Sequence, residues 1–150
     1  MNSTTVDFTA FVNSAGDAII AADGDGTIVL WNPAAERIFG FRAQEALGRS
    51  LDIIIPERFR ERHWHGYRTV MRTGHSQYGT EVLRVPARHR DGHDLSIAFT
   101  VALLPASEGG VGAIVAVVRD ETARWNEERA MRQRLKDLEQ QIHDRRPGPG

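Results

Sequence analysis

Residues 90–103 most constrain the fold, because they combine a tight turn with a strongly alternating strand. Arg90-Asp91-Gly92-His93 carries the Asp-Gly pair typical of a β-hairpin turn. The alternation that follows places one set of apolar side chains on a single face: Leu95, Ile97, Phe99, Val101 and Leu103. A hairpin strand with one apolar face predicts an antiparallel sheet that buries that face.

Four further strands are expected from similar patterns. Residues 17–22 and 27–31 flank an Asp-Gly-Asp-Gly turn and should form a second hairpin. Residues 80–89 alternate and lead into the 90–93 turn, so they should pair with the strand after it. Residues 111–118 are nearly all apolar, which predicts a strand in the middle of the sheet.

Helices are expected between and around these strands. A short helix is predicted over residues 6–14, and others over 33–39 and 42–47. Asn32-Pro33 is a helix start, because Asn accepts from free N–H groups and Pro needs none at the first helical position. Gly40 and Gly48 are predicted left-handed C-caps. An apolar run over 51–55 then leads into a longer helix that starts at Pro56 and ends at Gly74.

The helix that starts at Pro56 carries two histidines on different faces. One stripe at the helical period is apolar apart from a histidine: Phe59, His63, Tyr67 and Val70. The other stripe is polar: Arg62, His65, Thr69 and Arg72. His63 is therefore expected to face the interior and His65 to face solvent.

The last helix follows a heptad pattern, with apolar residues spaced 4, 3 and 4 apart: Met131, Leu135, Leu138 and Ile142. Charged residues surround this seam, so the helix should need a partner, most simply a second copy of the chain. We predict a homodimer through this helix, with the N-terminal helix as a further candidate contact. The expected organisation is a cap helix at 1–15, a sensor domain at 16–119, a coiled-coil helix at 120–144 and a disordered tail at 145–150.

Composition excludes several classes of function. The formal net charge of -1 favours neither nucleic acid nor a membrane surface as a partner. The absence of cysteine excludes disulfides, thiolate metal sites and cysteinyl photoadducts. The sequence has no signal-peptide pattern and no long apolar run, so it is expected in the cytoplasm. It has no catalytic constellation either, so it is not expected to be an enzyme.

Several motifs in this order resemble the PAS sensor family. The segments that match are DAIIAADGDGTIVLWNPAAERIFGF, EALGRSLDIIIPE, HRDGHDLSIAF and VAVVRDET, where Asp120 and Thr122 resemble the family's junction with its signalling helix. The resemblance implies an α+β fold, with a five-stranded antiparallel sheet, helices on one face and a pocket beneath the central helix. It also implies a partner downstream, such as a kinase or a transcriptional effector, and the chain is either a lone module or a piece of a larger sensor.

Within this family, RERH at residues 60–63 resembles the FixL-type haem sensors, in which the corresponding histidine binds haem iron. The resemblance implies haem b held by His63, with Tyr67 also in contact with it. It places Leu83, Phe99 and Val101 on the opposite side of the cofactor, and Arg68, Arg72 and His75 near the propionates. Where the oxygen sensors have Arg or Met on the third strand, this sequence has Leu83, so the gas site should lack a polar donor.

Other functions stay open on the sequence. His63 can instead be read as a buried histidine that binds a backbone carbonyl, in an interaction module whose pocket is empty or holds another small molecule. Trp31 and Asn32 resemble positions that contact flavin in other relatives, although Asn32 is also the predicted helix cap. His89 and His93 flank the 90–93 turn and are interpreted as surface residues, with no carboxylate-rich metal site around them.

Overall fold

The computed structural model describes residues 5–76 and 79–145, and the chain divides into two compact units between Asp120 and Glu121. The first unit contains eleven elements in chain order: α1 (Phe8–Ser14), β1 (Ala18–Asp23), β2 (Ile28–Trp31), α2 (Pro33–Phe39), α3 (Ala43–Ala46), η1 (Leu51–Ile54), η2 (Glu57–Phe59), α4 (Arg60–Thr73), β3 (Leu83–Arg88), β4 (Asp94–Pro105) and β5 (Val111–Asp120). The second unit contains α5 (Thr122–Arg145). No helix within the described ranges is long and apolar enough to cross a membrane.

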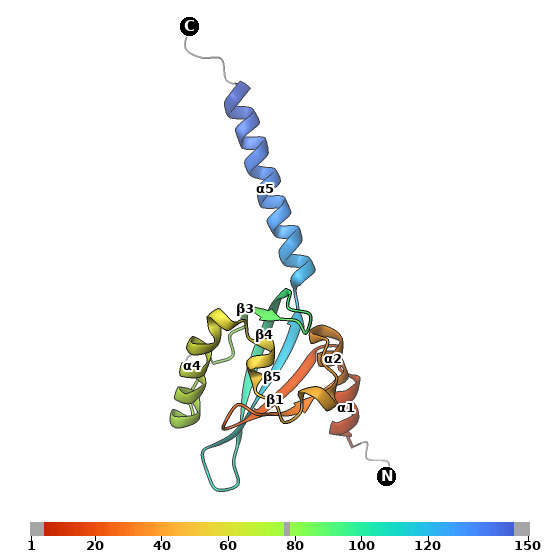
Figure 1. Ribbon diagram of the computed structural model, residues 1–150, viewed down its shortest axis with the longest axis vertical. Helices are drawn as coiled ribbons and strands as arrows, with labels where there is room; N and C mark the ends of the chain where they lie inside the picture. The colour runs from red at the N-terminus through yellow and green to blue at the C-terminus, as the bar shows by residue number, and fades with distance from the viewer. Residues whose placement is uncertain (1–4, 77–78, 146–150) are drawn as a thin grey trace. The chain divides into compact units, whose positions relative to one another are not determined.

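The five strands form one antiparallel sheet in the order β2-β1-β5-β4-β3. The apolar strand β5 lies in the centre, as its composition predicts. In Figure 1 the strands run through the middle of the first unit, with α4 on one side and α1 and α2 on the other. This arrangement confirms the predicted α+β fold.

One half of the sheet's inner face is closely packed. Ala18, Val118 and Phe99 are successive cross-strand partners, so they share this face. Next to them, side chains from α2, α3 and the strands form the core, including Phe39, Ala35, Ala46, Ile20, Ile28, Trp31, Leu95 and Ile97. Burial of this alternating set is the main force that fixes the strand register.

The other half of the inner face is incompletely covered by the described residues. Val101 and Leu103 on β4 pair with Ala116 and Ile114 on β5, and all four are only half-buried. Ile114 belongs to the central strand, and its side chain lies on the face that an antiparallel sheet normally packs against its core. This half of the sheet therefore has apolar surface available to something else.

Asn32 is a buried polar hub between α1, β1 and α2. Its Oδ1 accepts from the backbone N–H of Ile19 at 2.9 Å and of Ala35 at 3.0 Å. Its Nδ2 donates to the carbonyls of Val12 at 2.9 Å and Asp17 at 3.1 Å. The predicted cap on α2 is confirmed, and the same amide also fixes where the chain enters the sheet.

The end of α2 contacts the β3–β4 hairpin. Gly40 has a φ of 83°, and a Cβ at this position would lie 2.6 Å from Cε1 of His89. The backbone N–H of Arg90 donates to the Phe39 carbonyl at 2.9 Å. Glycine is required here both for its left-handed conformation and for the close approach of the His89 ring.

The two largest differences between predicted and observed boundaries concern α4 and β3. The helix predicted from Pro56 starts at Arg60, because Glu57–Phe59 forms a 3-10 turn and Phe59 has a ψ of -3°. The strand predicted from residue 80 starts at Leu83. The run over 51–55 is a second 3-10 turn, begun by Ser50, whose hydroxyl accepts from the Asp52 N–H at 3.1 Å.

The second unit consists of α5 and the residues around it. The four residues of the predicted seam, Met131, Leu135, Leu138 and Ile142, are between 47% and 72% exposed. Polar pairs one turn apart stabilise the helix surface, as between Arg124 and Glu128 at 3.2 Å. The helix runs to Arg145, which is the first residue of the predicted tail. Residues 146–150 lie outside the described part of the chain.

Candidate functional site

α4 is held over the β1–β2 turn by two aromatic residues. Tyr67 is the one residue of this helix that is buried, and its hydroxyl donates to the Asp23 carbonyl at 2.5 Å. Burial and the nearby Asp23 and Asp25 carboxylates raise the pKa of Tyr67 to about 12, so this hydroxyl stays protonated. The Trp64 ring lies against Gly26, where a Cβ would come within 2.1 Å of it.

Trp64 also joins α4 to η1. Its Nε1 donates to Oδ1 of Asp52 at 2.6 Å, which is a short bond to a charged acceptor. At the start of the same helix, Arg60 donates to the carbonyls of Ile55 at 3.1 Å and Asp52 at 3.2 Å. The sequence does not indicate Trp64 as an anchor, because this residue lies between the two stripes of α4 and its contacts come from distant parts of the chain.

His63 lies beside these anchors and is half-buried, whereas His65 is exposed, as the stripe pattern predicts. The ring centroid of His63 is 4.7 Å from that of Trp64 and 5.8 Å from that of Tyr67. Nδ1 of His63 is buried and has no hydrogen-bond partner among the described residues. The structure therefore does not contain the backbone hydrogen bond that a purely structural buried histidine would be expected to make at this atom.

Burial lowers the pKa of His63, and the nearby Asp52 carboxylate opposes this shift only in part. The imidazole is consequently neutral at pH 7, with a free lone pair on one ring nitrogen. A neutral imidazole is the form that binds a metal ion. A partly accessible, neutral histidine with an unsatisfied ring atom is a candidate ligand-binding group.

The three residues predicted to lie opposite His63 belong to the inner face of the sheet. Leu83 and Phe99 are cross-strand partners, and Val101 follows two residues later on β4, so the three share that face. All three are half-buried. They belong to the incompletely covered part of the sheet or border it, which makes this surface the apolar component of the candidate site.

The three residues predicted near the propionates are all exposed. Arg68 and Arg72 follow His63 by five and nine positions, which places them about 140° and 180° around the helix from it. His75 lies beyond the end of α4, after Gly74. These side chains therefore do not share the face of α4 that carries His63.

A family profile for the PAS fold matches residues 12–126. The chain belongs to the PAS family. The PAS domain is 31% identical over 134 residues to the sensor protein FixL of Bradyrhizobium diazoefficiens, and 25% identical over 126 residues to the oxygen sensor protein DosP of Escherichia coli. These matches cover 89% and 84% of this chain but only 25% and 15% of the two relatives.

Solved structures agree on the fold. A PAS domain from Colwellia psychrerythraea superimposes with a TM-score of 0.67 at 19% identity, and the match covers 77% of this chain and 95% of that one. At this identity the likeness concerns the fold alone. Family and fold together make the chain a PAS signal-sensing domain.

The flavin alternative concerned Trp31 and Asn32, which are both buried in this PAS domain. Nε1 of Trp31 donates to the Phe41 carbonyl at 2.9 Å. The amide of Asn32 makes the four hydrogen bonds of the polar hub. Both side chains thus have their polar atoms engaged within the protein.

The β3–β4 hairpin brings together His89, Asp91 and His93, where the sequence predicts surface histidines and no metal site. The rings of His89 and His93 are stacked with centroids 4.5 Å apart, and Nδ1 of each approaches Oδ1 of Asp91. One ligand atom from each of the three residues lies within 4.8 Å of the others. The carboxylate and backbone hydrogen bonds of the turn account for this geometry, since Asp91 also accepts from the His93 N–H at 3.0 Å.

Proposed function

We propose that this PAS domain binds haem b through His63 and senses a diatomic gas or the redox state of the iron. The observation that carries the proposal is the buried Nδ1 of His63, which has no hydrogen-bond partner among the described residues, in a domain whose sheet also has an incompletely covered apolar face. The resemblance of residues 60–63 to the haem sensors and the match to FixL and DosP support it. Haem would supply an iron centre that can bind a diatomic gas or change its redox state.

The residues present fit such a group. His63 would hold the iron, with Tyr67 and Trp64 fixing its ring from the same helix. Leu83, Phe99 and Val101 would cover the apolar macrocycle from the sheet. Arg68, Arg72 and His75 do not share the His63 face of α4, so they would have to reach around or beyond the helix to bind the propionates.

The sheet side of this site determines which gas it would favour. Leu83, Phe99 and Val101 carry no side-chain hydrogen-bond donor. A donor preferentially stabilises O₂, because O₂ becomes more polar than CO when it binds iron. We therefore expect weaker discrimination for O₂ over CO or NO than in a site with an arginine at the position of Leu83.

Output would pass along β5 into α5, since β5 ends at Asp120 and α5 begins at Thr122. We propose that α5 pairs with α5 of a second copy through its exposed apolar seam, and that a kinase or transcriptional effector receives the signal. The domain would act by binding and relay, without catalysis of its own. A paired helix of moderate stability can shift between arrangements when its domain changes.

The haem proposal is tested by the visible spectrum of the chain expressed with a haem precursor. Wild type should show a Soret band, His63→Ala should lose most of it, and added imidazole should restore part of it. His65→Ala is the matched control, because it removes a histidine two residues away that faces solvent. A Soret band of equal intensity in His63→Ala would overturn the assignment, and a colourless wild type that still dimerises would indicate an interaction module.

The dimer proposal is tested with Leu135→Asp combined with Leu138→Asp. These changes place charge in the middle of the seam, so light scattering should give the mass of a monomer. The control is Gln133→Asp with Gln140→Asp, which adds the same charge away from the four seam positions. An unchanged mass for the leucine variant would exclude this seam as the dimer contact.

A further inference from the structure

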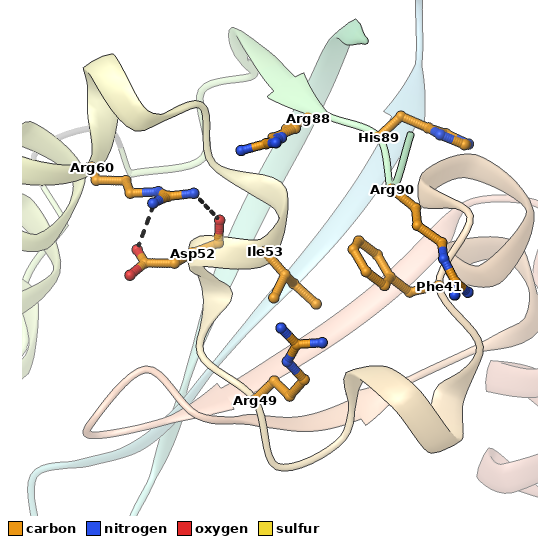
Figure 2. A pocket seen from close by; sticks show the side chains of 8 residues that line it. All are labelled: Phe41, Arg49, Asp52, Ile53, Arg60, Arg88, His89 and Arg90. Atoms are coloured by element: carbon orange, nitrogen blue, oxygen red, sulfur yellow. Dashed lines mark hydrogen bonds and ion pairs between the residues drawn. The ribbon is translucent and has the colours of Figure 1, made fainter. Parts of the chain in front are cut away.

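Four arginines line a cavity of about 340 Å³ that has no role in the proposed haem site. They come from separate parts of the chain, since Arg49 follows α3, Arg60 begins α4, and Arg88 and Arg90 lie at the end of β3 and in the hairpin. Figure 2 shows them on four sides of Ile53, with Phe41 between Ile53 and Arg90. His89 and Asp52 complete the lining.

Two of these arginines are already held in place. Arg60 donates to two backbone carbonyls, and its Nε lies 4.0 Å from the Asp52 carboxylate. Arg90 donates to Glu45 at 2.6 Å, and its guanidinium lies 5.9 Å from the centroid of the Phe41 ring. Asp52 is the one acidic residue in the lining, and it also accepts from Trp64.

The other two arginines have no hydrogen-bond or ion-pair partner for their side chains within residues 5–76 and 79–145. These are Arg49 and Arg88, both largely exposed. The four guanidinium groups carry four positive charges, and the carboxylates of Asp52 and Glu45 carry two negative ones. Two positive charges therefore remain at this cavity, although the whole chain has a net charge of -1. Like charges repel across a shared cavity, and an anion bound between them would relieve that repulsion.

We propose that this cavity binds a small organic dianion, with a phosphate monoester or a dicarboxylate as the two sources of that charge. Arg49 and Arg88 would bind the anion through their planar guanidinium groups, which match phosphate and carboxylate oxygens in pairs. Arg60 would present a further, fixed positive charge. Phe41 and Ile53 supply an apolar surface for the organic part, and the volume lies in the range of small-molecule pockets.

The anion site and the proposed haem site share no lining residue. His63, Leu83 and Phe99 are absent from the lining of this cavity. Asp52 lies near both sites, because it lines the cavity and also accepts from Trp64 beside His63. His63→Ala nevertheless removes none of the proposed anion contacts, so this variant should still bind the anion. Failure of either proposal leaves the other intact.

The test is titration calorimetry of the full chain in phosphate-free buffer at low salt, with inorganic phosphate, adenosine 5′-monophosphate and succinate as separate probes. Arg49→Gln and Arg88→Gln should each weaken binding roughly tenfold or more, because each removes a charged hydrogen-bond donor. Arg37→Gln on α2 is the matched control, since it removes an exposed arginine outside the cavity. Binding should also weaken as salt is added.

The probes separate the two sources of charge. Binding of the phosphate compounds without succinate identifies a phosphoryl ligand, and the reverse identifies a dicarboxylate. If none of the three probes gives a heat of binding, the proposal is overturned. Equal affinity in wild type, Arg49→Gln and Arg88→Gln would overturn it as well, with thermal unfolding used to verify that each variant is folded.

Discussion

Replacement of Asn32 by aspartate distinguishes a simple helix cap from the polar hub seen in the structure. As a cap alone, Asp is about as good as Asn, so the change would cost close to nothing. In the structure, however, the Nδ2 group donates to the carbonyls of Val12 and Asp17 inside the core. A carboxylate oxygen in its place would face two carbonyl oxygens with no proton between them.

The expected cost follows from the four hydrogen bonds. Asn32 is 1% exposed, so water cannot replace the lost partners. At about 1 kcal/mol for each bond, Asn32→Ala should lower the free energy of unfolding by about 4 kcal/mol. Asn32→Asp keeps the two bonds that Oδ1 accepts but buries a charge beside two carbonyls, so it should cost about 3 kcal/mol or more.

Urea unfolding followed by tryptophan fluorescence measures these differences. Ser50→Ala is the control, because the exposed Ser50 caps the η1 turn through a single bond and its loss should cost about 0.5–1 kcal/mol. The reasoning would be refuted if Asn32→Asp stayed within about 1 kcal/mol of wild type, a cost compatible with helix capping alone. It would then follow that the two amide donor bonds contribute little to stability.

Two further predictions concern His63 on α4 and the glycines Gly40 and Gly66. Because burial lowers the pKa of His63 below 6.5, the unfolded chain binds a proton at this residue at a higher pH than the folded chain does. The free energy of unfolding should therefore fall as the pH drops through 6.5. In haem-free protein, urea unfolding should show a smaller loss of stability on acidification for His63→Leu than for wild type, and an equal loss would contradict the burial argument. Gly40→Ala should destabilise the domain by about 1–2 kcal/mol or more, because the left-handed φ disfavours a side chain and the His89 ring occupies the space. Gly66→Ala, at an exposed position inside α4, should instead stabilise it by up to about 1 kcal/mol. Melting temperatures that shift in the same direction for both variants would contradict this contrast.

The local elements of this PAS domain are determined by short-range patterns in the sequence. Alternation at Leu95–Leu103 and the Asp-Gly turn before it predict the β3–β4 hairpin, since strand geometry depends on neighbouring residues. Asn32 and Gly40 mark both ends of α2 for the same local reason. The helical period also predicts that His63 faces inward while His65 faces solvent.

Contacts between distant residues were decided only by the tertiary structure. Trp64 anchors α4 through Asp52 and Gly26, which are 12 and 38 residues away in the sequence, and no period in α4 indicates either partner. The incompletely covered sheet face likewise depends on how distant elements pack, as does the buried Nδ1 of His63, which has no hydrogen-bond partner among the described residues. The four arginines of the cavity lie in different elements, and only the packing of η1, α4 and the hairpin brings their charges together.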